Sequence, residues 1–113
     1  MTVLILDLNN ESLIQLLRQN KYLKIITGTI CRPKLYPLPD VIILDFDQVF
    51  GHSDREDTLI MLASKLHPQV MIIACSRKWS DGTRKFARLF GADECIESNK
   101  IVEIVDRIKL FFS

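Results

Sequence analysis

Two carboxylates stand directly after an apolar run in the segment Asp40–Asp47, which reads DVIILDFD. The run Val41–Leu44 is short and rich in β-branched side chains, as expected of a strand that is buried on both faces of a parallel sheet. Asp45 and Asp47 follow where this strand ends. Because open α/β sheets bind ligands at the carboxyl ends of their strands, these two aspartates are candidates for a functional site. The alternative is that they are solvated loop residues or helix caps.

A second apolar run, Thr2–Leu6, also ends in an acid, Asp7. If the two strands are neighbours, Asp7 and Asp45 face one another across a crevice. Carboxylates held close together repel, which raises the pKa of at least one of them unless a cation is present, and Mg²⁺ prefers such oxygen ligands. With a cation bound, Asp45 can act as a carboxylate nucleophile toward a phosphoryl group.

Five apolar segments predict strands, and they alternate with segments whose apolar spacing predicts helices. The strands are expected at residues 2–6, 23–27, 41–44, 70–74 and 94–96. Short alternating units require right-handed crossovers and a parallel sheet, and five strands most often take the order 2-1-3-4-5. Residues 28–39 contain one glycine and three prolines, which predicts a short or irregular second crossover. In this order Ser76, after the fourth strand, lies on the same sheet edge as the acids.

The expected helix starts carry residues that can cap a helix. Candidate caps are Asn9 or Asn10, an S-x-x-E capping box of Ser53 and Glu56, Ser80 or Asp81, and Ser98 or Asn99. In the third helix the apolar residues are expected to face inward and the basic residues outward: Phe86, Ala87, Leu89 and Phe90 against Arg84, Lys85 and Arg88.

The composition predicts one globular domain spanning residues 1–113. The chain is 48% hydrophobic and 26% charged with a formal net charge of +1, so bulk charge gives no argument for nucleic acid or an anionic membrane. No run is long enough to cross a bilayer, and the expected location is cytoplasmic. Three unpaired cysteines predict reduced thiols, and neither zinc spacing nor the residue pattern of a hydrolase is visible.

Three motifs, LILDLNN, DVIILD and GADECIES followed by an apolar helix, resemble the receiver domain of bacterial response regulators over essentially the whole chain. The resemblance implies a flavodoxin-like, doubly wound α/β fold and a role in two-component signal transduction and phosphorelay. It implies that Asp45 is the phosphoacceptor position and Ser76 the switch hydroxyl position. It also implies a Mg²⁺ site of Asp7, Asp45 and the backbone carbonyl of Asp47. The carboxylate of Asp47 is an extra acid in this sequence, which would support the metal in part.

The sequence departs from that family pattern at four positions. Leu8 stands where the second metal-binding acid is expected, and Ser98 stands where the family has a lysine. Asn99 replaces the proline that follows this lysine, and Cys95 replaces the aromatic switch residue. The missing acid and lysine predict a weak or absent Mg²⁺ site and weak or absent phosphorylation. Candidate substitute cations are Lys100, which lies two residues after Ser98, and Lys78, which follows the fourth strand.

The favoured interpretation is a signalling domain, not an enzyme, that acts through protein contacts made by its last two helices and fifth strand. A histidine kinase, an output domain or a second copy of the chain are the expected partners. One alternative is a phosphoacceptor receiver modified on Asp45 by a histidine kinase. Another, less favoured, is a nucleic-acid or small-ligand module that uses the basic helix Arg84 to Arg88 and Trp79, an indole that suits a partner anchor or a lid.

Overall fold

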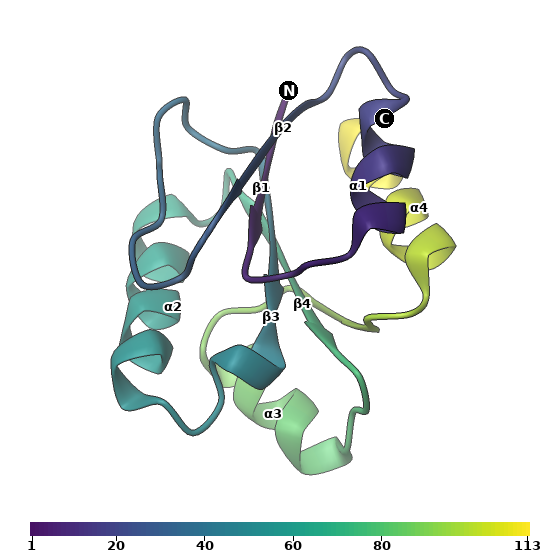
Figure 1. The fold of residues 1–113 in the computed structure, drawn as a ribbon. Helices are drawn as coiled ribbons and strands as arrows, with labels where there is room; N and C mark the ends of the chain where they lie inside the picture. Colours follow the sequence, from purple (N-terminus) through teal and green to yellow (C-terminus); the bar gives the residue numbers. More distant parts are fainter.

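The computed structural model describes residues 1–113, which form five strands and four α-helices (Figure 1). In chain order these are β1 (Thr2–Leu6), α1 (Glu11–Arg18), β2 (Lys24–Gly28), β3 (Val41–Asp45), the 3₁₀ turn η1 (Phe46–Gln48), α2 (Ser53–Leu66), β4 (Met71–Ser76), α3 (Asp81–Leu89), β5 (Glu94–Glu97) and α4 (Ile101–Phe112). All strand pairs are parallel, in the order β2-β1-β3-β4-β5. The fold class and strand order expected from the sequence are confirmed.

Helices cover both faces of the sheet (Figure 1). One core cluster lies between the sheet and the pair α2 and α3, and the other lies between the sheet and the pair α1 and α4. The strands β1 and β3 are in the middle, so both faces of each are covered, and every residue of Thr2–Leu6 and Val41–Leu44 is buried. This double burial explains why these strands are continuous apolar runs rather than alternating ones. None of the helices is long and apolar enough to cross a membrane.

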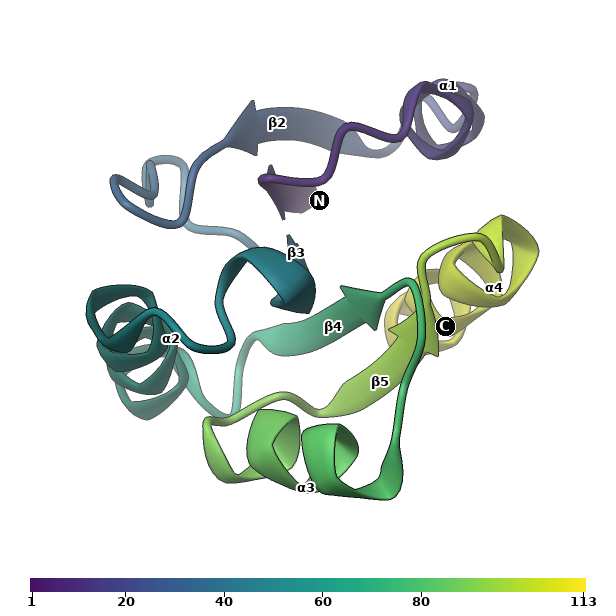
Figure 2. The same cartoon turned by 60° about the horizontal axis from the view of Figure 1, so that its bottom comes forward.

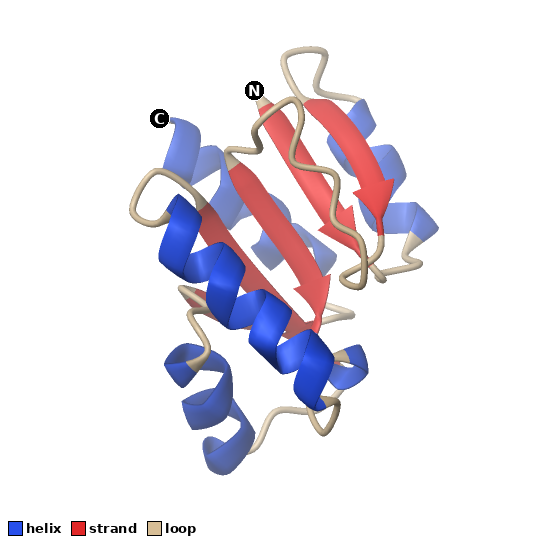
Figure 3. Cartoon of the chain, turned by 90° about the vertical axis from the view of Figure 1, so that its left-hand side faces the viewer, coloured by secondary structure: helices blue, strands red, loops and turns tan.

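The connection between β2 and β3 contains no helix, as its glycine and prolines predicted. Figure 3 shows this loop lying over the sheet beside α2. Ile30 is its buried anchor in the α2 and α3 cluster, and the backbone N–H of Ile30 donates to Oδ2 of Asp7 at 2.9 Å. The irregular crossover is therefore attached to the end of β1.

Two of the expected helix caps form and two do not. Asn10 accepts from the N–H of Leu13, and Ser80 makes a reciprocal capping box with Thr83. The predicted box at Ser53 is wrong because α2 begins there and His52 is its N-cap; Glu56 accepts instead from the N–H of Gly51 at 2.8 Å. The predicted cap at Ser98 or Asn99 is also wrong. Helix α4 begins two residues later, with Lys100 at the N-cap and no side-chain cap.

The inward-facing prediction for α3 holds in part. Ala87 is fully buried and Phe90 packs against the core, but Phe86 is 45% exposed and Leu89 is 69% exposed. Only nine residues make up the helix, and the sheet covers a narrow stripe of it. The apolar arc of α3 is therefore wider than the surface available to bury it.

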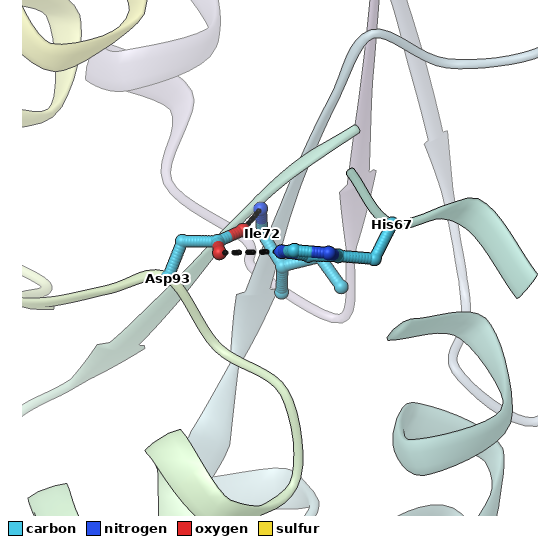
Figure 4. A network of polar contacts seen from close by, with 3 residues as sticks. All are labelled: His67, Ile72 and Asp93. Atoms are coloured by element: carbon cyan, nitrogen blue, oxygen red, sulfur yellow. Dashed lines mark hydrogen bonds and ion pairs between the residues drawn. The ribbon is translucent and has the colours of Figure 1, made fainter. Parts of the chain in front are cut away.

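The amino end of the sheet is held by Asp93, the acid of the GAD motif (Figure 4). Its Oδ2 accepts from the N–H of Ile72 at 2.8 Å, and its Oδ1 lies 3.5 Å from Nε2 of His67, which ends α2. Gly91 precedes this acid and adopts a left-handed φ of +114°. These contacts lie at the amino ends of the strands, so the motif stabilises the fold on the side away from the candidate site.

We expect Gly91→Ala to destabilise the fold. A Cβ at residue 91 would overlap with the Cβ of Ala63, and the left-handed backbone disfavours any L side chain. Together these effects should lower the free energy of unfolding by about 2–3 kcal/mol in urea denaturation. Gly82→Ala is the matched control, since a Cβ at residue 82 would meet only Oγ of Ser80, at 3.9 Å, and it should instead stabilise by about 0.4–1 kcal/mol. Equal stabilities of the two variants would contradict this explanation.

Candidate functional site

An open cleft of about 470 Å³ lies at the carboxyl ends of β1, β3 and β4, the edge that faces the viewer in Figure 2. Its lining comes from the end of β3, the connections that follow β1, β3, β4 and β5, and the start of α1: Asp7, Leu8, Asn9, Asn10, Glu11, Ser12, Asp45, Gln48, Arg77 and Ser98. An adjoining cavity of about 430 Å³ is lined by Asn10, Arg77, Ser98 and Asn99. The sheet order brings Asp7 and Asp45 to one cleft, as the strand ends predicted.

Asp45 is the last residue of β3 and lies half-buried at the base of the cleft. Its Oδ1 accepts from the N–H of Asp47 at 2.9 Å, which caps η1. Burial raises the pKa of the Asp45 carboxyl above its ordinary value, and the negative charges of Asp47 and Asp7 act in the same direction. The hydrogen bond from Asp47 and the positive charge of Arg77 oppose this increase only in part.

Asp7 occupies an unusual backbone position, with a left-handed φ of +58°. This conformation turns the chain sharply after β1, and aspartate tolerates it better than most L residues do. One carboxylate oxygen of Asp7 accepts from the N–H of Ile30. Asp7 therefore has a structural task, holding the β2–β3 loop, in addition to lining the cleft.

Asp47 and Ser76 bind each other. The hydroxyl of Ser76 donates to Oδ1 of Asp47 at 2.6 Å, and Oδ2 of Asp47 accepts from the N–H of Arg77 at 3.0 Å. Both oxygens of Asp47 are thus engaged on the connection that follows β4. We call these two hydrogen bonds the Asp47 clamp.

The alternation of side chains along the strands explains why Ser76 does not line the cleft. Asp45 pairs with Cys75, so Ser76 lies one residue further along. Cys75 belongs to the α1 and α4 cluster, and successive residues point to opposite faces. Ser76 therefore points toward the α2 and α3 side, where η1 places Asp47. The four residues predicted for the site share one sheet edge but not one face.

The donor set does not fit the Mg²⁺ site that the family resemblance implied. Asp7 and Asp45 each use one oxygen for a backbone N–H, and Asp47 uses both of its oxygens within the clamp. Leu8 is only 8% exposed and packs into the α1 and α4 cluster. No group of three or more histidine, cysteine, aspartate or glutamate side chains converges as metal ligands. The extra carboxylate of Asp47 does not line the cleft, so the support expected from it is missing, and the backbone carbonyl remains the ligand implied at this position.

The cation that lines the cleft is Arg77, which the sequence interpretation passed over. The two lysines considered as substitutes do not line it: Lys78 is exposed, and Nζ of Lys100 lies 3.9 Å from Glu97. The only signal in the sequence was the position of Arg77 directly after Ser76. Ser98, at the family's lysine position, does line the cleft, and its carbonyl accepts from Nδ2 of Asn10 at 3.2 Å.

The two buried cysteines offer no nucleophile. Burial raises the pKa of the Cys75 thiol to about 12, and the charge of the neighbouring Asp45 acts in the same direction. Burial also raises the pKa of Cys95, the residue at the family's aromatic switch position. Both residues are neutral thiols at neutral pH, so the cleft lacks the thiolate that covalent cysteine chemistry requires.

Trp79 belongs to an aromatic cluster rather than standing free. Its ring stacks on Phe46 with centroids 5.5 Å apart, and Cζ of Arg84 lies 6.0 Å from the ring centroid. Phe50, Phe86 and Phe90 extend the same cluster. Packing on one side and an arginine close to the ring make Trp79 a structural residue, which weakens the interpretation of this region as a base-stacking platform or as a lid.

We expect Asp45→Asn to be more stable than the wild type at neutral pH. The unfolded chain loses the Asp45 proton near pH 3.8, whereas the native state keeps it up to a higher pH. Because the native state binds more protons in that window, the stability contributed by Asp45 falls as pH rises through it. Asparagine still accepts from the N–H of Asp47 without carrying a charge.

Urea denaturation across the pH range from about 4 to 7 tests this prediction. The stability advantage of Asp45→Asn should shrink toward the acid end of the range. Asp106→Asn, which removes an exposed acid from α4, should show no such change. An Asp45→Asn variant that is less stable than the wild type at pH 7 would contradict the predicted direction.

Solved structures of other proteins have a fold similar to that of this chain. No protein-family model and no curated protein matches the sequence. The structure is similar to the signal receiver domain of the DNA-binding response regulator merR from Colwellia psychrerythraea 34H, with 19% identity, a TM-score of 0.75, and coverage of 99% of this chain and 98% of that one. A CheY-like response regulator protein from Mesorhizobium loti gives 12% identity, a TM-score of 0.74 and 97% coverage of both chains.

A two-component response regulator from Clostridium difficile is similar to the same degree, with 16% identity, a TM-score of 0.73, and coverage of 99% of this chain and 95% of that one. At these identities the similarity is one of fold, and it extends over nearly the whole of each chain. The chain therefore has the flavodoxin-like fold of response-regulator receiver domains.

Proposed function

We propose that this chain is an atypical receiver-like signalling domain that acts through protein contacts, with phosphorylation weak or absent. The observation that carries the proposal is the Asp47 clamp. Phosphoryl transfer to a carboxylate depends on cations and hydrogen-bond donors placed around the developing charge. The Ser76 hydroxyl is instead bound to Asp47 on the opposite face from Asp45, and the family's lysine position holds Ser98.

The contact surface that we propose is made by α3, β5 and α4. Strand β5 is an edge strand, so one row of its backbone groups has no partner strand. Large apolar side chains on the two flanking helices are exposed, with Leu89 at 69%, Val102 at 68% and Leu110 at 65%. Exposed apolar side chains on neighbouring elements mark protein-interaction surfaces. A histidine kinase, an output domain or a second copy of this chain would bind here.

A phosphoacceptor receiver is the second candidate function. The open cleft supports it, because Asp45 lines this cleft and a small phosphodonor could approach its free oxygen. In that case a histidine kinase would modify Asp45, and Asp7 and Arg77 would be the charged neighbours of the acyl phosphate. The two candidates differ in one measurable property, the extent of phosphorylation on Asp45.

Incubation with acetyl phosphate and Mg²⁺, followed by intact-mass spectrometry, separates the two candidates. We expect little or no addition of a phosphoryl group to the wild type, because neither a full metal shell nor the lysine is present to stabilise the transferred charge. Asp45→Asn is the control and should give the same spectrum. Efficient labelling of the wild type that Asp45→Asn abolishes would support the phosphoacceptor receiver and contradict the proposal of weak or absent phosphorylation.

The surface of α3, β5 and α4 can be tested on the chain by itself. We expect weak self-association, seen as a light-scattering mass that rises with protein concentration. The double variant Leu89→Lys and Val102→Lys should remain monomeric at every concentration, because both changes place charge on the proposed surface. Met61→Lys, which adds the same charge at an exposed position on α2, should associate like the wild type. Equal association of the two variants would place the interface elsewhere.

A further inference from the structure

Arg77 is the one residue of positive charge that lines the cleft, and it also lines the adjoining cavity. It follows the last residue of β4, and its backbone N–H donates to Oδ2 of Asp47. The hydroxyl of Ser76 holds the other oxygen of that carboxylate. The Asp47 clamp therefore fixes the backbone from which the guanidinium projects.

Asp7 and Asp45 each keep only one free carboxylate oxygen for a divalent cation. Mg²⁺ takes six oxygen ligands in near-octahedral geometry. In proteins it is usually held by one or two carboxylates, and water molecules supply most of the other ligands. Asp7 and Asp45 have each given one oxygen to a backbone N–H. The carboxylate of Asp47 is held in the clamp, and Leu8, which lines the cleft, offers no oxygen to a metal.

We propose that the cleft carries its own cation, with the guanidinium of Arg77 balancing the charge of Asp7 and Asp45 in place of Mg²⁺. This inference rests on the proposed function and deepens it. An arginine is not deprotonated at physiological pH, and as part of the chain it does not dissociate as a metal ion does. The charge state of the cleft is then set by the fold rather than by the concentration of a divalent ion.

The proposal gives Asp47 a positioning role. A carboxylate that bound the metal would need to point into the cleft, whereas this one points to the far face of the sheet and fixes the connection from β4 to α3. Arginine and a divalent cation repel each other at the short distances found in one cleft. Arg77 should therefore both replace Mg²⁺ and oppose its binding.

Titration with MgCl₂, followed by backbone amide chemical shifts of Asp7, Asp45 and Gln48, tests the proposal. The wild type should show no saturable shift over the millimolar range. Arg77→Gln leaves the acids of the cleft, Asp7, Glu11 and Asp45, without a cation, so it should bind Mg²⁺ saturably and at least about tenfold more tightly than the wild type. Lys78→Gln removes the adjacent exposed charge, which does not line the cleft, and should behave like the wild type.

Arg77→Lys keeps a positive charge and should restore the behaviour of the wild type. Poor dispersion of the amide spectrum would reveal that Arg77→Gln does not fold well. Arg77→Lys then provides a second variant in which the role of the charge can be tested. Saturable Mg²⁺ binding to the wild type that Arg77→Gln leaves unchanged or weakens would overturn the proposal. Efficient labelling of the wild type by acetyl phosphate would overturn the proposed function. The Mg²⁺ titration would still decide separately whether Arg77 replaces the metal.

Discussion

The chemistry of the cleft depends on the hydrogen bond from the Ser76 hydroxyl to Oδ1 of Asp47, at 2.6 Å. Ser76 is 3% exposed, and a short bond between a buried hydroxyl and a carboxylate is among the stronger hydrogen bonds in proteins. It withdraws two polar side chains from the cleft at once. It also fixes Asp47 so that its second oxygen receives the N–H of Arg77. This one contact therefore determines which polar side chains lie in the cleft and how the backbone at Arg77 is held.

Apolar packing beneath the cleft holds the contact between Ser76 and Asp47 in place. Phe46 precedes Asp47 in η1 and is 1% exposed, stacked against Trp79 from the connection after β4. The aromatic pair and the Asp47 clamp therefore join the same two segments, one through apolar contact and the other through polar contact. Reorienting Asp47 into the cleft would break both, because η1 would have to rotate out of the core. The orientation of Asp47 at the carboxyl ends of the strands therefore depends on apolar packing as well as on polar contacts.

The fold could be predicted from the sequence because its strongest signals are local and repeated. Val41–Leu44 and Thr2–Leu6 are apolar at every position, which only doubly covered strands require, and the prolines between residues 28 and 39 exclude a helix there. The predictions that were wrong concern helix starts, where the side chains make other contacts than the local pattern suggests. Glu56 accepts from Gly51 rather than serving a capping box at Ser53, and α4 starts beyond its expected caps because Ser98 lies in the cleft wall.

The candidate site was predictable only as far as the sheet edge. Asp7 and Asp45 meet because the strand order makes β1 and β3 neighbours. The direction in which each side chain points was not predictable, since it depends on the register of β3 with β4 and on the short turn η1 after Asp45. Arg77 was missed for the same reason. Its sequence neighbours gave no sign that it, rather than Lys78, would line the cleft.

The most direct test of whether the Asp47 clamp keeps this edge from assembling a phosphoryl site is a crystal structure grown with Mg²⁺ and beryllium fluoride, an analogue of the phosphoryl group. We expect the Ser76 hydroxyl to remain on Asp47 and Arg77 to line the cleft, with no metal ion between Asp7 and Asp45. An octahedral Mg²⁺ bound by Asp7 and Asp45, with beryllium fluoride on Asp45 and the Ser76 hydroxyl turned toward it, would contradict that expectation.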